Sequence, residues 1–150
     1  MNLDIQLNPD LADIQSEDLK DFYERWLALK DQCGGYPQRA NLDPNLFISH
    51  LPWVALNAYD PELDQFRVRI FGTAYVEAVG RDPTGQIVQS PGLIKKFKEV
   101  VRTGSPYLSL HNQLVWADRE FRYYNVLGVP FFTEDKCVSH IFFRVEFSAT

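Results

Sequence analysis

FRVRIFGTAYVEAVGRDPTG, residues 66–85, is the stretch that decides the fold class of this chain. Its first residues alternate between apolar side chains and arginine. Since successive side chains of a strand point to opposite faces, they predict a half-buried strand. Gly72 gives the backbone freedom for a sharp corner, and Thr73 is suited to cap a short helix of small and apolar residues. Gly80 is typical of a helix end, and the residues after it favour a turn.

This order of elements, with Gly-Arg-Asp-Pro-Thr-Gly at residues 80–85, resembles the core of a PAS domain. Pro-x-Arg, Leu-Asp-Pro and Leu-Pro steps between residues 37 and 52 resemble the short bacterial proteins that consist of a single PAS domain. The resemblance extends over residues 19–147. Residues 129–136 depart from it, because Val-Pro-Phe-Phe-Thr-Glu-Asp-Lys stands where that branch commonly has a Leu-Pro-Leu-like step and a glycine-containing turn.

One domain is expected, because 150 residues suffice for a single hydrophobic core. We expect an arm at residues 1–15, a helix and connector at 16–52, and a PAS-like core at 53–150. Apolar and alternating runs predict five strands, at residues 53–58, 65–71, 107–116, 121–132 and 138–147. The resemblance and the layering of secondary structure imply an α+β fold: a five-stranded antiparallel sheet with helices on one face, plus an N-terminal amphipathic helix.

An apolar stripe defines that N-terminal helix. After the N-cap residue Ser16, large apolar side chains recur at helical spacing, namely at Leu19, Phe22, Tyr23, Trp26 and Leu27. Their burial is worth on the order of 8–12 kcal/mol before ordering entropy is subtracted, so the stripe must be covered. Either the outer face of the chain's own sheet covers it, or another subunit does. In the second case these five residues are an interaction surface, and both alternatives stay open.

A concave cup is expected between the sheet and the central helices, and such concave surfaces are where small molecules bind. The alternation of the strands and the spacing of the helices assign nine residues to it: Ile70, Tyr75, Val76, Val79, Phe97, Val101, Tyr124, Val126 and Phe143. These residues either line a ligand-binding cup or fill a core without a cavity, and the sequence leaves both interpretations open.

Composition excludes several kinds of partner. The net charge of −5 argues against nucleic acid, because nucleic-acid-binding proteins usually present a basic surface. No apolar run is long enough to cross a bilayer and the N-terminus lacks a signal-peptide pattern, so we expect a cytoplasmic protein without a membrane partner. Cys33 and Cys137 are expected to be reduced thiols, the usual state in the cytosol.

Catalytic and metal-binding motifs are missing from the sequence. It has no Gly-x-Ser-x-Gly elbow, no phosphate-binding loop and no clustered metal ligands, so no catalytic residue and no metal site are assigned. Haem is not expected, because His50, His111 and His140 all lie outside the helix predicted at residues 90–103, where the resemblance requires a histidine that faces the cup. Flavin is not expected either, because neither cysteine stands in an Asn-Cys-Arg-like helix.

The resemblance implies a sensory or adaptor domain in bacterial signalling that works by binding and has no output module of its own. The expected partners are a second copy in a homodimer, a signalling protein and a small apolar or aromatic ligand. The alternative is a small enzyme, such as an isomerase, that uses the concave pocket of a curved sheet. It requires an acid or base in the pocket, and the nearest charges are Glu77 and Asp82 at the rim. Because helix geometry points Glu77 to solvent, no enzyme is expected.

Overall fold

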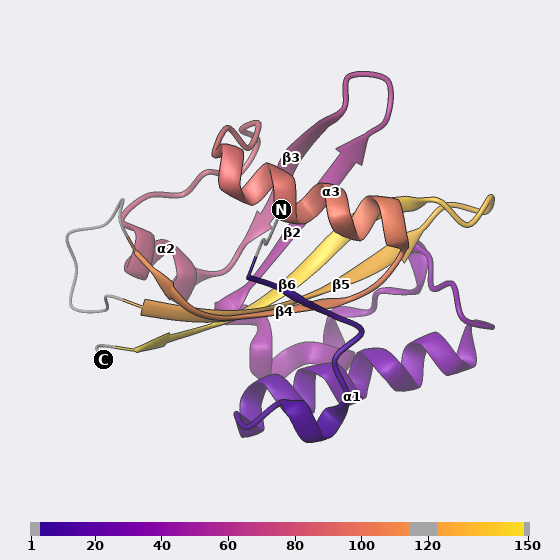
Figure 1. Cartoon of the computed structure of the whole chain (residues 1–150), viewed down its shortest axis with the longest axis horizontal. Coiled ribbons are helices and arrows are strands. Elements are labelled where there is room, and N and C mark those ends of the chain that lie inside the picture. Colours follow the sequence, from indigo (N-terminus) through magenta and orange to yellow (C-terminus); the bar gives the residue numbers. More distant parts are fainter. Residues whose placement is uncertain (1–3, 115–122, 149–150) are drawn as a thin grey trace.

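An antiparallel sheet of six strands runs through the computed structural model, which describes residues 4–114 and 123–148 (Figure 1). The strand order across the sheet is β1-β4-β5-β6-β2-β3. The strands are β1 (Gln6–Leu7), β2 (Val54–Asp60), β3 (Gln65–Phe71), β4 (Tyr107–Gln113), β5 (Tyr123–Phe132) and β6 (Val138–Ser148). The α+β class is confirmed, and the first two predicted strands share one sheet with the last three. The predicted strand ends at residues 116 and 121 lie outside the described residues.

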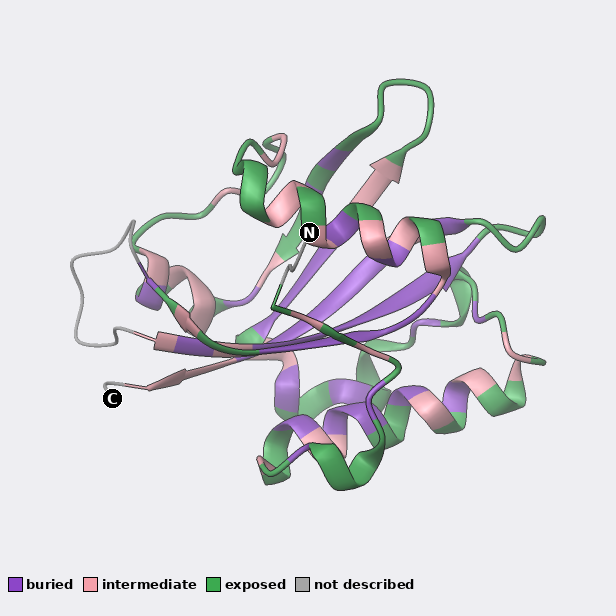
Figure 2. Ribbon diagram, viewed as in Figure 1, coloured by how far each residue is buried: buried purple, intermediate pink, exposed green. Residues whose placement is uncertain are grey.

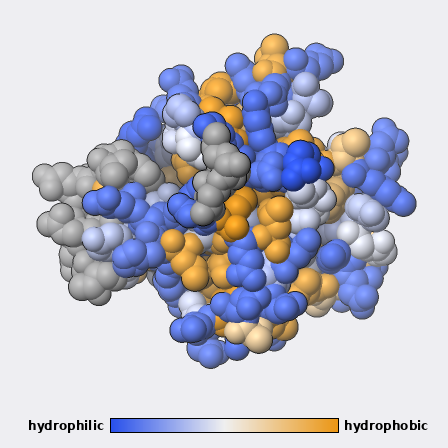
Figure 3. Space-filling model, in the orientation of Figure 1, coloured by the Kyte–Doolittle hydropathy of each residue, from blue (hydrophilic) through white to orange (hydrophobic). Residues whose placement is uncertain are grey.

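The prediction of five strands is wrong by one, because part of the expected N-terminal arm joins the sheet. Gln6 pairs with Leu108, and Leu7 pairs with Tyr107, so β1 continues the sheet beyond β4. β1 is only two residues long, and its register with β4 ends at Leu108. Figure 3 shows hydrophobic residues at the surface on this side of the molecule, between α3 and α1 and around the grey atoms.

Helices cover both faces of the sheet rather than one. The helical elements are η1 (Leu11–Asp13), α1 (Glu17–Gln32), η2 (Arg39–Asn41), η3 (Pro44–Trp53), α2 (Thr73–Val79) and α3 (Pro91–Thr103). α3 crosses one face, and α1 runs along the opposite face (Figure 1). Ser16 caps α1, as predicted, and Ser90 caps α3, each accepting a backbone hydrogen bond from the third residue of its helix.

The α1 stripe is buried against the chain's own sheet, which corrects its assignment as an interaction surface. Leu19, Phe22, Tyr23 and Trp26 are buried, and Leu27 is half-buried against the same cluster. The Phe22 ring lies 5.3 Å from the rings of both Phe47 and Phe142, between η3 and the sheet. Figure 2 shows the buried residues of α1 turned toward the sheet. The physical reason is that this face of β5 and β6 is itself apolar and must be covered.

The corner between β3 and α2 needs glycine for space rather than for an unusual φ. Gly72 has φ −64°, which any residue adopts, but a Cβ there would collide with the carbonyl groups of Leu51 and Pro52 in η3. Gly72 is also the N-cap residue of α2, so the predicted cap at Thr73 is off by one position. Gly80 ends the helix with φ +94°, as predicted.

Replacing Gly72→Ala is expected to lower the free energy of unfolding by about 1–3 kcal/mol, because the new methyl group forces the β3–α2 corner away from η3. The measurement is urea unfolding followed by circular dichroism. Gly92→Ala is the matched control, since nothing lies within 4 Å of a Cβ at that position in α3. Equal midpoints for the two variants would contradict this account of the corner.

Candidate functional site

A pocket of about 730 Å³ lies on the α3 face of the sheet and is here called the cup. Its described walls come from β2, β3, α2, α3, β4, β5, β6 and the segment between α2 and α3. Small-molecule sites in proteins are typically roughly 300–1,000 Å³ and largely apolar, with a few placed polar groups. The cup therefore has the size and the mixed lining of a ligand site, although Phe97, Tyr124, Val126 and Phe143 in its wall also belong to the buried core cluster on this face.

Six of the nine residues assigned to the cup from the sequence lie on its wall: Tyr75, Val79, Phe97, Tyr124, Val126 and Phe143. The other three, Ile70, Val76 and Val101, are not among its described lining residues. Tyr75 and Val79 share one face of α2, being four residues apart, and Val76 is rotated away from that face. Val101 packs into the core on the α3 side.

A β-bulge explains why Ile70 fails as a cup residue. Leu56 pairs with Ile70 but Asn57 pairs with Val68, so β3 carries one extra residue, Arg69, at this point. An extra residue reverses the alternation that follows it, because side chains change face at every position. Ile70 is 40% exposed as a result, and Phe71 lines the cup in its place.

Asn57 on β2 is a cup residue that the sequence analysis missed. It is only 5% exposed, and its Oδ1 has no hydrogen-bond partner among the described residues. A buried polar group without a partner costs about 1–3 kcal/mol, so such groups are uncommon in stable folds. Asn57 lies two positions after Ala55 on the same strand, so both side chains point inward to the cup. A polar residue at an inward-facing position among apolar neighbours is the signal that could have identified it.

Three tyrosines line the cup, namely Tyr75, Tyr107 and Tyr124. Burial raises the pKa of Tyr124 to about 12, and it also raises the pKa of Tyr75 and Tyr107 well above the ordinary value, with a smaller contribution from the neighbouring tyrosines. All three are therefore neutral phenols at physiological pH, able both to donate and to accept hydrogen bonds. Gly128 makes room for this arrangement, since a Cβ there would lie 3.0 Å from Tyr107 Cδ1.

The charged residues among the described lining of the cup are Arg67 and Arg81. Arg67 Nη1 donates to the carbonyl oxygen of Gly85 at 2.6 Å, and Arg81 Nη1 donates to Gln86 Oε1 at 3.2 Å. None of the described lining residues is Asp or Glu. Of the two carboxylates considered for the enzyme alternative, Glu77 borders a cleft on the other side of α2.

Asp82, the other carboxylate considered for the enzyme alternative, accepts hydrogen bonds from Thr84 in an exposed turn. It is not among the described residues of the cup wall. Neither carboxylate therefore stands where a general acid or base of the cup would have to be.

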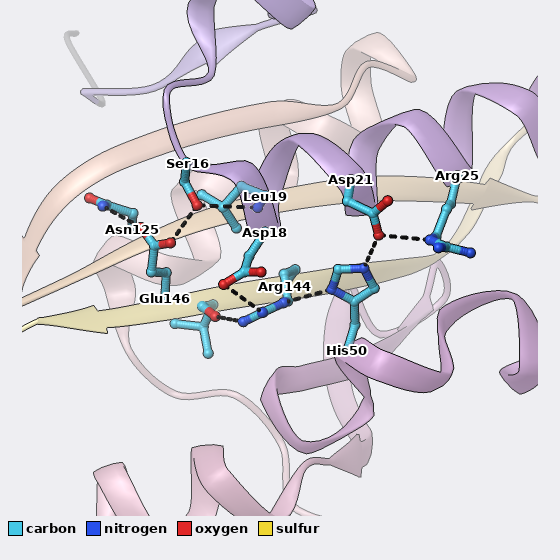
Figure 4. Close-up of polar contacts among 10 residues, drawn as sticks. Ser16, Asp18, Leu19, Asp21, Arg25, His50, Asn125, Arg144 and Glu146 are labelled. Atoms are coloured by element: carbon cyan, nitrogen blue, oxygen red, sulfur yellow. Dashed lines mark hydrogen bonds and ion pairs between the residues drawn. The ribbon is translucent and has the colours of Figure 1, made fainter.

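A second cleft, of about 890 Å³, lies between α1, η3, α2 and β6 and contains a paired polar network (Figure 4). Arg144 on β6 is 4% exposed, and its guanidinium lies over the Trp53 ring at 4.8 Å. Arg144 Nε donates to His50 Nδ1 at 3.0 Å, and Arg144 Nη2 is 3.6 Å from Asp18 Oδ2. Nε2 of His50 lies 2.7 Å from Asp21 Oδ2. The network joins α1, η3 and the sheet.

The two contacts of His50 determine its tautomer. Because Arg144 Nε can only donate, His50 Nδ1 must accept, and the proton of the neutral ring lies on Nε2 and points to Asp21. Burial lowers the pKa of His50, and the Arg144 charge lowers it as well, against the opposing effect of Asp21. A hydrogen bond from Arg25, above all, lowers the pKa of Asp21. The network is therefore built for a neutral His50.

The remaining histidines and the cysteines lie away from the cup. His111 stacks on Tyr123, and His140 Nδ1 lies 2.8 Å from the hydroxyl oxygen of Ser139. Cys33 and Cys137 are free thiols. No histidine or cysteine is among the described residues of the cup wall. The expectations that haem and flavin are not bound stay predictions.

No protein-family model and no curated protein matches this chain. A solved structure of an RNA-binding light-oxygen-voltage receptor is similar over 75% of this chain and 36% of that chain, with 14% sequence identity and a TM-score of 0.48. The chain thus spans little more than a third of that receptor, and a similarity at this level assigns neither family nor function. Across residues 4–114 and 123–148, no helix has the length and apolarity needed to span a bilayer.

Acidification is expected to destabilise the protein through His50. Its folded-state pKa lies below the ordinary value of 6.5, so the stability that the neutral ring contributes is present above that pH and is lost as the pH falls toward the folded pKa. Burial also lowers the pKa of His140, which adds in the same direction. In urea unfolding at pH 7.5, 6.5, 5.5 and 5.0, His50→Gln should be less stable than wild type at pH 7.5 and lose less stability on acidification. His111→Asn is the control and should keep the wild-type dependence of the free energy of unfolding on pH. The same wild-type dependence in His50→Gln would refute the role given to the neutral His50 ring.

Proposed function

We propose that this chain is a PAS-like sensory or adaptor domain that acts by binding a small molecule in the cup. The observation that carries the proposal is Asn57 Oδ1, a buried acceptor without a partner among the described residues, in the wall of a cavity of about 730 Å³. A ligand N–H or O–H that reaches this oxygen removes its desolvation cost on binding. The ligand is therefore a small molecule with an apolar or aromatic body and at least one hydrogen-bond donor.

The arrangement of the elements supports a PAS-like interpretation. The sequence resemblance implies two strands, crossing helices and three further strands in one sheet, and β2 to β6 are connected in this way. Aromatic rings gather on the cup side: Phe97 lies 4.9 Å from Phe143, and Phe71 lies 4.1 Å from Tyr75. Such walls suit a planar or apolar ligand.

Helix α2 offers a route from the cup to the outside. Tyr75 and Val79 line the cup, whereas Ala74, Glu77 and Ala78 of the same helix line the second cleft beside η3. A ligand that binds one position of α2 more tightly than another shifts the population between them, and a ligand with equal affinity shifts nothing. The change reaches the α1 side of the sheet, where a signalling protein or a second copy of the chain is the proposed recipient.

The enzyme alternative is not favoured, because none of the described wall residues of the cup supplies a carboxylate or imidazole for proton transfer. Binding therefore accounts for the lining better than catalysis does.

Native mass spectrometry of protein purified without refolding, with its absorbance spectrum, tests the proposal. A defined additional mass is expected, and it identifies the ligand class. A protein-only mass that persists after incubation with a cell extract of metabolites, together with an unchanged melting temperature, would contradict ligand binding.

Asn57→Leu gives the sharper test. Removing the amide, whose Oδ1 has no partner among the described residues, is expected to raise the stability of the ligand-free protein by about 1–2 kcal/mol and to reduce the fraction of ligand-bound protein. Ser109→Ala is the matched control, since Ser109 is a buried polar residue on β4 whose hydroxyl is hydrogen-bonded to Asn112. It should lower stability and leave the bound ligand in place. Loss of stability in Asn57→Leu with unchanged ligand occupancy would remove the basis of the proposal.

A further inference from the structure

The charged residues of the cup have the opposite sign to the net charge of the chain. The chain has a net charge of −5, yet both charged residues among the described lining of the cup are arginines. Both arginines are exposed at the mouth of the cup, where their positive charges attract an anion that approaches it. Among the described lining residues, the positive charge at the mouth of the cup therefore comes from Arg67 and Arg81.

Both guanidiniums are held at the rim by the segment that follows α2. Arg67, on the edge strand β3, is fixed by the carbonyl oxygen of Gly85, and Arg81 by the side chain of Gln86. The same segment pairs with β3, since Gly85 N donates to Val68 O and Val68 N donates to Gln86 O. Each arginine has five N–H donors and uses one of them in the bond named here, so the fork geometry that suits carboxylates is available at the rim.

Asn57 places a second requirement on the ligand. It belongs to β2, where it pairs with Val68, the residue next to Arg67. A molecule in the cup thus meets a buried acceptor from β2 and cationic donors from β3 and from the segment after α2, together with aromatic and aliphatic wall residues. The two polar features select opposite groups, because Asn57 Oδ1 accepts from a donor and the arginines attract an anion.

We propose that the ligand of the cup, whose existence rests on the proposed function, is a small organic carboxylate. It has an aromatic or apolar body and one N–H or O–H donor. Its carboxylate lies at Arg67 and Arg81, its body fills the wall formed by the Phe and Tyr side chains, and its donor bonds Asn57 Oδ1. No covalent step is involved.

Isothermal titration of the full chain with three probes tests this ligand class. Indole-3-acetate has the carboxylate, the aromatic body and an N–H group; indole-3-acetamide lacks the charge, and naphthalene-1-acetate lacks the N–H group. A charge-assisted hydrogen bond is worth about 1.5–3 kcal/mol, so the acid should bind roughly 10–100-fold more tightly than its amide. Indole-3-acetate should also bind more tightly than naphthalene-1-acetate, and Asn57→Leu should abolish that second difference.

Variants at the rim separate this inference from a general preference for acids. Arg67→Gln and Arg81→Gln should each reduce the preference for acid over amide by about tenfold. Arg69→Gln is the matched control, because Arg69 is an exposed arginine of the same strand and is not among the described residues of the cup. The affinity of the acid, and not of the amide, should fall as the salt concentration rises.

If the amide binds as tightly as the acid, or if the rim variants leave the preference unchanged, the carboxylate assignment is overturned, while the cup remains a ligand site. If no probe binds, the carboxylate assignment is also overturned, and native mass spectrometry then decides on the cup itself. If the preference falls in Arg67→Gln and Arg81→Gln but not in Arg69→Gln, the assignment is supported.

Discussion

Strand β5 is apolar on both of its faces, and this constraint organises the molecule. Leu127, Val129 and Phe131 are buried on the α1 side, whereas Tyr124 and Val126 are buried on the α3 side. A sheet whose central strand is apolar on both faces needs a layer on each side. α1 with η3 supplies one layer and α3 the other, so the amphipathic stripe of α1 is used within the chain.

The two layers differ in the side chains that line them. On the α1 side, rings such as Phe22, Phe47 and Phe142 lie within 5.3 Å of one another and form a tightly packed core. On the α3 side, the helix and sheet leave the cup, with a buried amide and tyrosine side chains in its wall. Each side of the sheet has a cavity, but the buried polar atom that lacks a partner among the described residues lies in the wall of the cup.

Polar groups on the α1 side are paired, in contrast with Asn57. Arg144 is buried but bonds His50 and the Val145 carbonyl oxygen, and it lies over Trp53. A buried charge is tolerated when its hydrogen bonds are satisfied, because the penalty falls on unpaired groups. The two sites therefore differ: the paired network holds α1, η3 and the sheet together, whereas the unpaired Asn57 Oδ1 is the group that the proposed ligand would bond.

The amino-acid sequence by itself determined the elements whose causes are local. Ser16 and Ser90 cap helices, Gly80 ends one with a positive φ, and the alternation in residues 66–68 marks a strand, since each of these depends on side chains a few positions apart. Six of nine cup residues followed from the same alternation and spacing.

Only the tertiary structure decided the rest. The bulge at Arg69 depends on the register between β2 and β3, and it exchanged Ile70 for Phe71 in the cup. The neutral tautomer of His50 depends on Arg144, which is 94 positions away along the chain. The lack of a partner for Asn57 is a property of everything packed around it. Pairing and burial between distant segments have no signature in local sequence, because they arise from contacts that exist only after the chain has folded.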